Sequence, residues 1–319
     1  MLLDDAALNP ASCRLCPRAC GANRAAGERG VCGAAGEVLI ARFAGSGTIF
    51  FAHCPLRCSY CQNTVIAHGA LGYPVTVAHL AELCCDLERQ GALNINFVTP
   101  THYAPHARAA VRAARERGMA LPVVWNTSGY ETVEAVRANA GAVDVYLTDF
   151  KYADAQLGAR YSHVADYPER ALAALDAMVE QTGAPAYDVY HGQERLVSGV
   201  VVRHLLLPRH LDDSKRVVRL LHERYGSAVR LSIMNQYTPV LATAAQSGND
   251  AARAVLDRCP ELAERVPDEA YEELLDFADE IGVEDYFWQE GGACEESFIP
   301  AFSGVEEGAS CTESDPSGA

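Results

Sequence analysis

Six short apolar segments alternate with helical segments over most of the chain, and this alternation restricts the possible folds more than any other feature. The apolar segments lie at 47–52, 94–98, 122–126, 142–150, 199–208 and 229–237. Helical patterns fall at 76–92, 104–117, 131–138, 166–183, 214–226 and 267–281. Nearly continuous apolar runs joined by helices are typical of buried parallel strands. The pattern fits either a doubly wound open sheet or a β/α barrel of six units.

Polar side chains occur near the ends of these predicted strands. They include Thr101, Asn126, Ser128, Asp149, Lys151, Arg203 and Gln236. Both candidate architectures place their functional sites at the carboxyl edge of the parallel strands. The sequence therefore predicts that these side chains share one cleft.

Three cysteines, Cys54, Cys58 and Cys61, occupy a single short segment, HCPLRCSYCQN, directly after the first predicted strand. Three thiolates suit a [4Fe–4S] cluster with one iron left open, because sulfur ligation is soft and an open coordination position marks a catalytic metal. The alternative is a zinc ion that takes His53 as its fourth ligand.

A second set, Cys13, Cys16, Cys20 and Cys32, supplies four thiols at C-x2-C-x3-C-x11-C spacing. Four thiolates form a closed site, which is either structural zinc or an auxiliary iron–sulfur cluster. Spacing does not choose between them, although a compact glycine-rich segment ahead of the predicted barrel favours zinc or another structural role. Disulfides fit poorly with the cytosolic location that we expect from an acidic N-terminus without a secretory signal.

The pattern C-x3-C-x2-C, with Tyr60 just before the last cysteine, resembles the signature of the radical S-adenosylmethionine (radical SAM) enzymes. The similarity extends over about residues 11–303 to the activating enzyme of pyruvate formate-lyase and to its uncharacterised PflX-like relatives. It is carried by stretches such as FVTPTHY, NTSGY, DFKY, VVRHLLLP and IMNQY. The resemblance implies a partial (β/α)6 barrel of the TIM type, a [4Fe–4S] cluster and S-adenosylmethionine (SAM), which binds the iron that no cysteine ligates.

The resemblance also implies roles for individual residues. Cys54, Cys58 and Cys61 match the cluster ligands, and Tyr60 matches a residue that packs near adenine. Asp149 and Lys151 match residues that contact SAM; Lys151 is one of only two lysines in the chain, beside 24 arginines. The remaining cofactor positions are Asn126, Ser128, Arg203 and Gln236.

One departure from the activating enzymes concerns the glycine-rich G-G-E turn, which holds the amino group of SAM. This chain has Thr99-Pro100-Thr101-His102 there, and Thr101 is the candidate replacement. His102 and His106 are interpreted as structural histidines at a helix start rather than as catalytic groups.

The chain is expected to divide into a cysteine-rich segment (1–44), a radical SAM core (45–240), a helical extension with a possible lid (241–303) and a disordered acidic tail (304–319). Its net charge of −16 is concentrated at the C-terminal end, since 260–319 holds eighteen acidic residues and one basic residue, Arg265. An acidic chain disfavours nucleic acid as a partner. No apolar run reaches the length of a membrane span.

The leading functional hypothesis is an activase-like enzyme that removes hydrogen from a protein or peptide, with a glycyl-radical enzyme as one possible target and flavodoxin or ferredoxin as electron donor. The first alternative is a radical SAM modifier of a small molecule or another substrate. The non-enzymatic alternative is an iron–sulfur electron carrier or a zinc scaffold.

Overall fold

The structure is a computed structural model that describes residues 5–44, 47–69 and 71–288. The possible lid at 286–302 lies almost wholly outside these residues, as do Cys294, Cys311 and the acidic tail. None of the described helices is long and apolar enough to cross a membrane.

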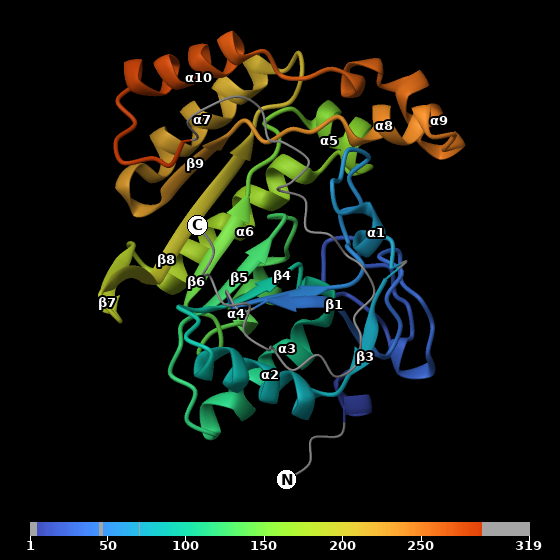
Figure 1. The fold of residues 1–319 in the computed structure, drawn as a ribbon, viewed down its shortest axis with the longest axis vertical. Helices are drawn as coiled ribbons and strands as arrows, with labels where there is room; N and C mark the ends of the chain where they lie inside the picture. The colour runs from blue at the N-terminus through green and yellow to red at the C-terminus, as the bar shows by residue number, and fades with distance from the viewer. Residues whose placement is uncertain (1–4, 45–46, 70, 289–319) are drawn as a thin grey trace, which may run out of the picture.

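Six parallel strands form the centre of the sheet (Figure 1). They are β2 (Thr48–Phe51), β4 (Ile95–Val98), β5 (Val123–Thr127), β6 (Val145–Asp149), β8 (Gln193–Leu205) and β9 (Arg230–Met234). Each strand pairs in parallel with the next one along the chain. A doubly wound sheet would reverse its strand order at a switch point, whereas this order is that of a β/α barrel. The six predicted strands and the open six-unit barrel are therefore confirmed.

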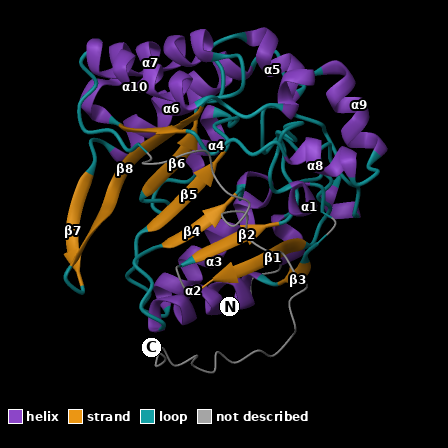
Figure 2. Cartoon of the chain, turned by 45° about the horizontal axis from the view of Figure 1, so that its top comes forward, coloured by secondary structure: helices purple, strands orange, loops and turns teal. Residues whose placement is uncertain are grey.

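Three further strands extend the sheet at its two edges, and the sequence analysis did not predict them. At one edge, β1 (Val38–Ala44) runs antiparallel to β2, and β3 (Tyr73–Val75) runs antiparallel to β1. At the other edge, β7 (Ala186–Tyr190) forms a hairpin with β8. Figure 2 shows the strands fanning from β7 to β3 without closing into a ring.

The β7–β8 hairpin turns through two residues that both have positive φ, His191 at 52° and Gly192 at 77°. Positive φ at both central positions is the signature of a type I′ turn, whose twist matches that of the flanking strands. This turn explains why β8 begins at Gln193, well before the predicted start of that strand at 199.

The predicted helices are present, with small shifts at their ends. They are α2 (Val77–Arg89), α3 (Ala104–Glu116), α4 (Val133–Ala138), α6 (Tyr167–Thr182), α7 (Leu211–Tyr225) and α10 (Asp268–Glu280). In α2 the Thr76 hydroxyl caps the first turn by accepting a hydrogen bond from the backbone N–H of His79 at 3.2 Å. Its buried face includes Leu80, Leu83 and Leu87, which are spaced as an amphipathic helix requires.

Other helical segments were not predicted. They are α1 (Thr64–Ala67), α5 (Ala155–Ser162), α8 (Val240–Gln246), α9 (Asp250–Arg258) and five short 3₁₀ turns, η1 (Asp5–Leu8), η2 (Arg24–Ala26), η3 (Thr101–Tyr103), η4 (Gly226–Ala228) and η5 (Pro260–Ala263). Helix α10 packs along α7, and α2 packs beside α3 (Figure 1). The apolar core lies between the sheet and its helices and contains fully buried aromatic side chains such as Phe97, Trp125 and Tyr146.

Candidate functional site

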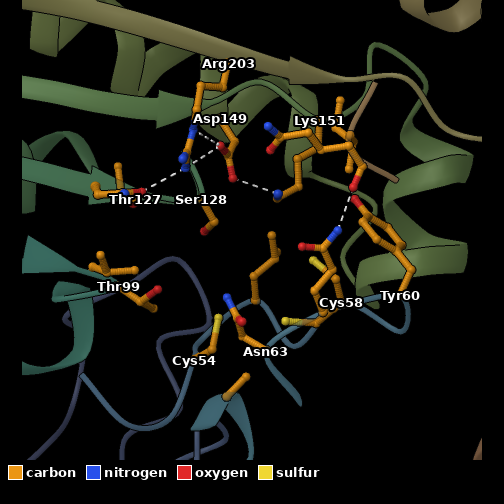
Figure 3. Close-up of a pocket in the computed structure, with 18 of the residues that line it drawn as sticks. Cys54, Cys58, Tyr60, Asn63, Thr99, Thr127, Ser128, Asp149, Lys151 and Arg203 are labelled. Atoms are coloured by element: carbon orange, nitrogen blue, oxygen red, sulfur yellow. Dashed lines mark hydrogen bonds and ion pairs between the residues drawn. The ribbon is translucent and has the colours of Figure 1, made fainter. Parts of the chain in front are cut away.

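A cavity of about 450 Å³ lies at the carboxyl ends of the parallel strands. Figure 3 shows Cys54 and Cys58 on one side of it, with Asp149, Lys151 and Arg203 facing them from the strand ends. Its lining includes every predicted cluster and cofactor residue of the barrel except Thr101, namely Cys54, Cys58, Cys61, Tyr60, Asn126, Ser128, Asp149, Lys151, Arg203 and Gln236. The structure thus brings these residues together in one cavity, whose volume is in the range of small-molecule and cofactor sites.

The three cysteines lie in the loop between β2 and α1. Two residues of this loop, His53 at 73° and Arg57 at 57°, have positive φ, and the backbone N–H of Cys61 donates to the carbonyl of Cys58 at 3.2 Å. These features bend the loop tightly, so that the three thiols face one cavity.

Burial raises the pKa of the Cys54 thiol to about 11, with a further contribution from Cys58. Burial also raises the pKa of the Cys61 thiol to about 12, and both of the other cysteines contribute. Neighbouring thiols therefore oppose the ionisation of Cys54 and of Cys61. A bound cationic metal centre would remove this penalty, because it takes thiolates as ligands.

The donor set fits a [4Fe–4S] cluster. Three soft sulfur donors line one cavity, and no fourth cysteine is found in its lining. Among the described residues no group of three or more His, Cys, Asp or Glu side chains could hold a metal ion. A cubane cluster has a different requirement, since each cysteine binds a different iron and the sulfurs surround the cluster instead of meeting at one point.

One carboxylate, that of Asp149, lies between two cations at the ends of β6 and β8. Lys151 Nζ is 2.7 Å from Asp149 Oδ2, and Arg203 Nε donates to Asp149 Oδ1 at 2.9 Å. Burial alone would raise the pKa of Asp149, but Arg203 and Lys151 outweigh it and hold that pKa below its usual value. The three groups together carry one net positive charge, which suits an anionic part of a ligand.

Asn126 is joined to this set because its Oδ1 accepts a hydrogen bond from Arg203 Nη2 at 2.8 Å. Ser128 is fixed through its backbone carbonyl, which accepts from the Tyr167 hydroxyl at 2.8 Å. The backbone carbonyl of Gln236 accepts from Gln62 Nε2 at 2.6 Å, which ties the end of β9 to the three-cysteine loop.

The structure locates Thr101 away from the cavity. Its buried hydroxyl donates to Glu131 Oε1 at 2.6 Å, and the hydroxyl of Thr127 donates to the same oxygen at 2.7 Å. Thr101 begins the 3₁₀ turn η3, so its side chain turns toward the buried Glu131. Thr99, at a positive φ of 57°, lines the cavity instead.

Several lining residues were missed by the sequence analysis. They include Thr48, Phe50, Asn63, Asn96, Val98, Thr127, Met234 and Tyr237. In β2 and β4, half-buried and fully buried residues alternate, and the half-buried ones line the cavity. The two-residue period of a strand could have identified them from the sequence, because alternate residues face the cavity and the helices.

The four N-terminal cysteines are free thiols. Burial raises the pKa of Cys16 to about 12, and Cys32 and Cys13 add to it. Burial also favours a higher pKa for Cys20, but hydrogen bonds from the Ala22 and Val31 backbones and from Cys13 lower it. These four cysteines are not among the described side-chain groups that could hold a metal ion, and the second metal site stays a prediction.

Two arginines tie this N-terminal segment to the three-cysteine loop. Arg18, between Cys16 and Cys20, donates to the carbonyls of Pro55 and Leu56 at 3.0 Å each. In the reverse direction, Arg57 donates to the carbonyl of Val31 at 3.1 Å. Each cysteine segment thus contributes an arginine that binds the backbone of the other.

His102 and His106 have backbone partners. His102 Nε2 lies 2.8 Å from the Ala52 carbonyl, and His106 Nε2 lies 3.1 Å from the carbonyl of Asp5. Burial lowers the pKa of His102 to about 3. Both side chains are buried outside the cavity lining, which agrees with their interpretation as structural histidines.

Residues 43–162 match the family model of a 4Fe-4S single cluster domain. The matched range contains Cys54, Cys58 and Cys61 and excludes the four N-terminal cysteines. The match supports the iron–sulfur interpretation of the three-cysteine loop.

Among known proteins, the chain is similar to an uncharacterised protein of Methanocaldococcus jannaschii, with 29% identity over 249 residues. The match covers 72% of this chain and 66% of that protein, slightly less than two thirds of its length.

Two solved structures are more distantly similar to the chain. SuiB of Streptococcus suis bound to the precursor peptide SuiA has 12% identity and a TM-score of 0.48, over 74% of this chain and 46% of that one. A radical SAM methyltransferase from Sphaerobacter thermophilus has 15% identity and a TM-score of 0.47, over 82% of this chain and 72% of that one.

Proposed function

We propose that this chain is a radical SAM enzyme in which Cys54, Cys58 and Cys61 hold a [4Fe–4S] cluster and the strand-end residues hold SAM. The observation that carries the proposal is the shared cavity, which is lined both by the three thiols and by Asp149, Lys151 and Arg203. Cys54 and Cys58 face these three residues across it (Figure 3). An electron carrier would need no such polar set opposite its cluster, nor would a zinc scaffold.

When bound, the cluster and SAM supply one electron and a 5′-deoxyadenosyl radical that removes a hydrogen atom from the substrate. The protein's own residues orient and shield these groups. Arg203 and Lys151 offer cationic donors to SAM, while Asp149 keeps both side chains in place through contacts of 2.9 and 2.7 Å. Asn126 and Ser128 supply polar groups beside them, and Tyr60 and Gln236 complete the cofactor positions.

The substrate class follows from the sequence resemblance to activating enzymes. We propose a protein or peptide substrate, with a glycyl-radical enzyme as the first one to test and flavodoxin or ferredoxin as electron donor. The absence of a G-G-E turn means that the amino group of SAM is held differently here. Thr99, which lines the cavity at that position, is the residue that we now favour for this contact.

The test is anaerobic reconstitution with iron and sulfide, reduction with dithionite, addition of SAM and chromatography of the products. The proposal expects 5′-deoxyadenosine and methionine in equal amounts. Cys58→Ala should abolish both products, whereas Cys85→Ala, at a half-buried thiol in α2, should retain them. Cys16→Ala should keep part of the activity if the N-terminal set is structural.

Two outcomes would refute the proposal. One is a wild-type protein that carries four irons per chain and yet yields no 5′-deoxyadenosine. The other is cleavage that survives Cys58→Ala undiminished. Supplying a candidate glycyl-radical enzyme in the same assay, and looking for its radical by electron paramagnetic resonance, separates the activase from other radical SAM enzymes.

A further inference from the structure

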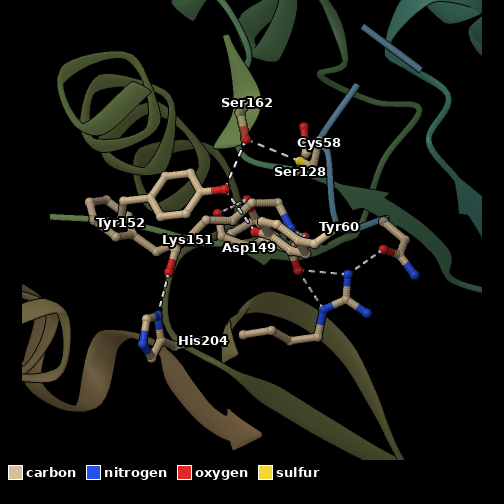
Figure 4. Close-up of polar contacts among 12 residues, drawn as sticks. Cys58, Tyr60, Ser128, Asp149, Lys151, Tyr152, Ser162 and His204 are labelled. Carbon is tan, nitrogen blue, oxygen red and sulfur yellow. Dashed lines mark hydrogen bonds and ion pairs between the residues drawn. The ribbon is translucent and has the colours of Figure 1, made fainter. Parts of the chain in front are cut away.

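The sulfur of Cys58, the second cysteine of the loop, accepts a hydrogen bond from a buried side chain outside the loop. The Ser162 hydroxyl, at the last residue of α5, donates to Cys58 Sγ at 3.1 Å. Figure 4 shows this contact and its continuation to Tyr152. Ser162 has no exposed surface, so water does not compete for its hydroxyl.

The Ser162 hydroxyl belongs to a chain of buried hydroxyl groups. Tyr152 Oη lies 2.9 Å from Ser162 Oγ and 2.8 Å from Tyr60 Oη. Each hydroxyl carries one proton and can both donate and accept. Tyr152 donates to Tyr60, Ser162 donates to Cys58, and the contact between Tyr152 and Ser162 fixes the position of the Ser162 hydroxyl.

Hydrogen bonds to the backbone hold Ser162 next to the cysteine loop. The N–H of Ser59, next to Cys58, donates to the carbonyl of Tyr161 at 2.7 Å. Arg18 Nη2 donates to the carbonyls of both Ser162 and Leu56 at 3.0 Å. The end of α5 and the cysteine loop are thereby fixed to each other independently of the Ser162 hydroxyl.

We propose that Ser162 is a positioning residue that tunes the cluster, with the phenol of Tyr152 holding its hydroxyl beside Cys58. This inference rests on the proposed function, because it requires Cys58 to ligate a [4Fe–4S] cluster. Reduction adds negative charge to a cluster and its thiolates, and a donor at the sulfur stabilises that charge. The Ser162 hydroxyl therefore raises the reduction potential of the cluster, so that the cluster is reduced more readily.

The test is a redox titration of the reconstituted protein without SAM, followed by electron paramagnetic resonance or absorption spectroscopy. Ser162→Ala should disfavour reduction about tenfold, which is a midpoint about 59 mV lower for a one-electron couple. Tyr152→Phe should shift the midpoint less and in the same direction, because Ser162 keeps its hydroxyl but loses the phenol that orients it. Ser162→Thr, which retains a hydroxyl, should restore the midpoint if the extra methyl group is accommodated.

Ser59→Ala is the matched control. Ser59 is adjacent to Cys58, but its hydroxyl lies 3.4 Å from His163 Nε2 and does not line the cavity. Its loss should leave the midpoint unchanged. An unaltered or raised midpoint in Ser162→Ala, or an equal shift in Ser59→Ala, overturns the proposal.

If Ser162→Ala binds fewer than four irons, Tyr152→Phe decides the question alone: a lowered midpoint supports the proposal and an unchanged one overturns it. The redox titration also distinguishes a failure of this inference from a failure of the proposed function. A wild-type protein that holds a cluster but does not cleave SAM refutes the enzyme, while the order of the midpoints still decides the role of Ser162. A wild-type protein that holds no cluster refutes both.

Discussion

Arg18 and Leu56, from two different cysteine segments, are joined by a hydrogen bond of 3.0 Å between Nη2 and the backbone carbonyl. The same guanidinium also donates to Pro55 and to the carbonyls of Ser162 and His163 at the end of α5. One side chain from the N-terminal segment therefore fixes the turn between Cys54 and Cys58 against the helix that carries Ser162. The planar guanidinium suits this role because its five N–H donors can reach several acceptors, whereas the ammonium group of a lysine has only three donors.

We therefore expect Arg18→Ala to reduce the iron bound after reconstitution several-fold and to destabilise the protein by about 2–3 kcal/mol, because several charge-assisted hydrogen bonds are lost. Arg18→Lys should recover only part of the bound iron and only part of the lost stability. Arg14→Ala, at an exposed arginine between Cys13 and Cys16, is the control and should resemble the wild type. Iron analysis and urea unfolding check this, and equal values for Arg18→Ala and Arg14→Ala would count against the account.

Gly129 lies where β5 and β6 end at the cavity. A Cβ added there would be 2.2 Å from the carbonyl oxygen of Asp149, and the residue has a φ of +79°. Since the obstacle is backbone, Gly129→Ala must displace the strand end that carries Asp149. We expect a loss of about 3 kcal/mol or more, which is the strain of a left-handed alanine plus the cost of the clash, and weaker SAM binding.

Gly141→Ala is the control for that substitution. Gly141 has a similar φ of +73°, but a Cβ there would meet nothing within 4 Å. It should cost only the backbone strain, about 1–2 kcal/mol, and leave SAM binding unchanged. Unfolding curves together with equilibrium dialysis of SAM compare the two, and similar losses in both variants would contradict the expectation.

The chain's two lysines permit a matched comparison. Lys151 lies in the cavity against Asp149, whereas Lys215 in α7 forms an exposed ion pair with Glu273 at 2.6 Å. Lys151→Arg should weaken SAM binding at least about tenfold, because the larger planar guanidinium does not fit where a compact ammonium does. Lys215→Arg should bind SAM like the wild type. Isothermal titration calorimetry of the reconstituted proteins distinguishes them, and unimpaired binding by Lys151→Arg would remove Lys151 from the site.

The buried His204 should make stability depend on pH. Burial lowers its pKa from 6.5 to about 4, partly offset by the contact of its Nδ1 with the Phe150 carbonyl at 2.8 Å. A base whose pKa is lower in the folded state binds its proton more readily when unfolded. This contribution is therefore complete above pH 6.5, and it decreases by up to about 1.4 kcal/mol per pH unit as the pH falls toward 4.

His204→Asn keeps a donor near the position of Nδ1 but does not titrate. The variant should be less stable than the wild type at pH 7 because it is smaller, yet its stability should decrease less between pH 7 and pH 5. Urea unfolding at both values measures the slopes. Identical slopes would mean that His204 does not contribute to the pH dependence.

The sequence predicted the six parallel strands because each is a nearly continuous apolar run. Since functional sites lie at the carboxyl ends of parallel strands, Asp149, Lys151 and Arg203 were then expected at one edge of the sheet. It left two architectures open, because apolar runs carry no information on strand order. Only the pairing of each strand with the next one along the chain distinguishes a barrel from a doubly wound sheet.

What the sequence missed depends on contacts between distant segments. Strands β3 and β7 are short strands at the edges of the sheet, which pattern alone does not separate from loops. Thr101 was predicted to contact the cofactor, but its hydroxyl donates a hydrogen bond to the buried Glu131, which the sequence pattern does not reveal. Ser162 carries no sequence signal at all, since its role depends on α5 reaching Cys58, 104 residues earlier.

The most direct test of the central claim is the Mössbauer spectrum of the anaerobically reconstituted protein, recorded before and after SAM is added. The account predicts a [4Fe–4S] cluster in which one iron changes its signal when SAM binds, with that response lost in Cys58→Ala. A metal centre at Cys54, Cys58 and Cys61 that is already fully ligated, and whose spectrum SAM leaves unaltered, would contradict it.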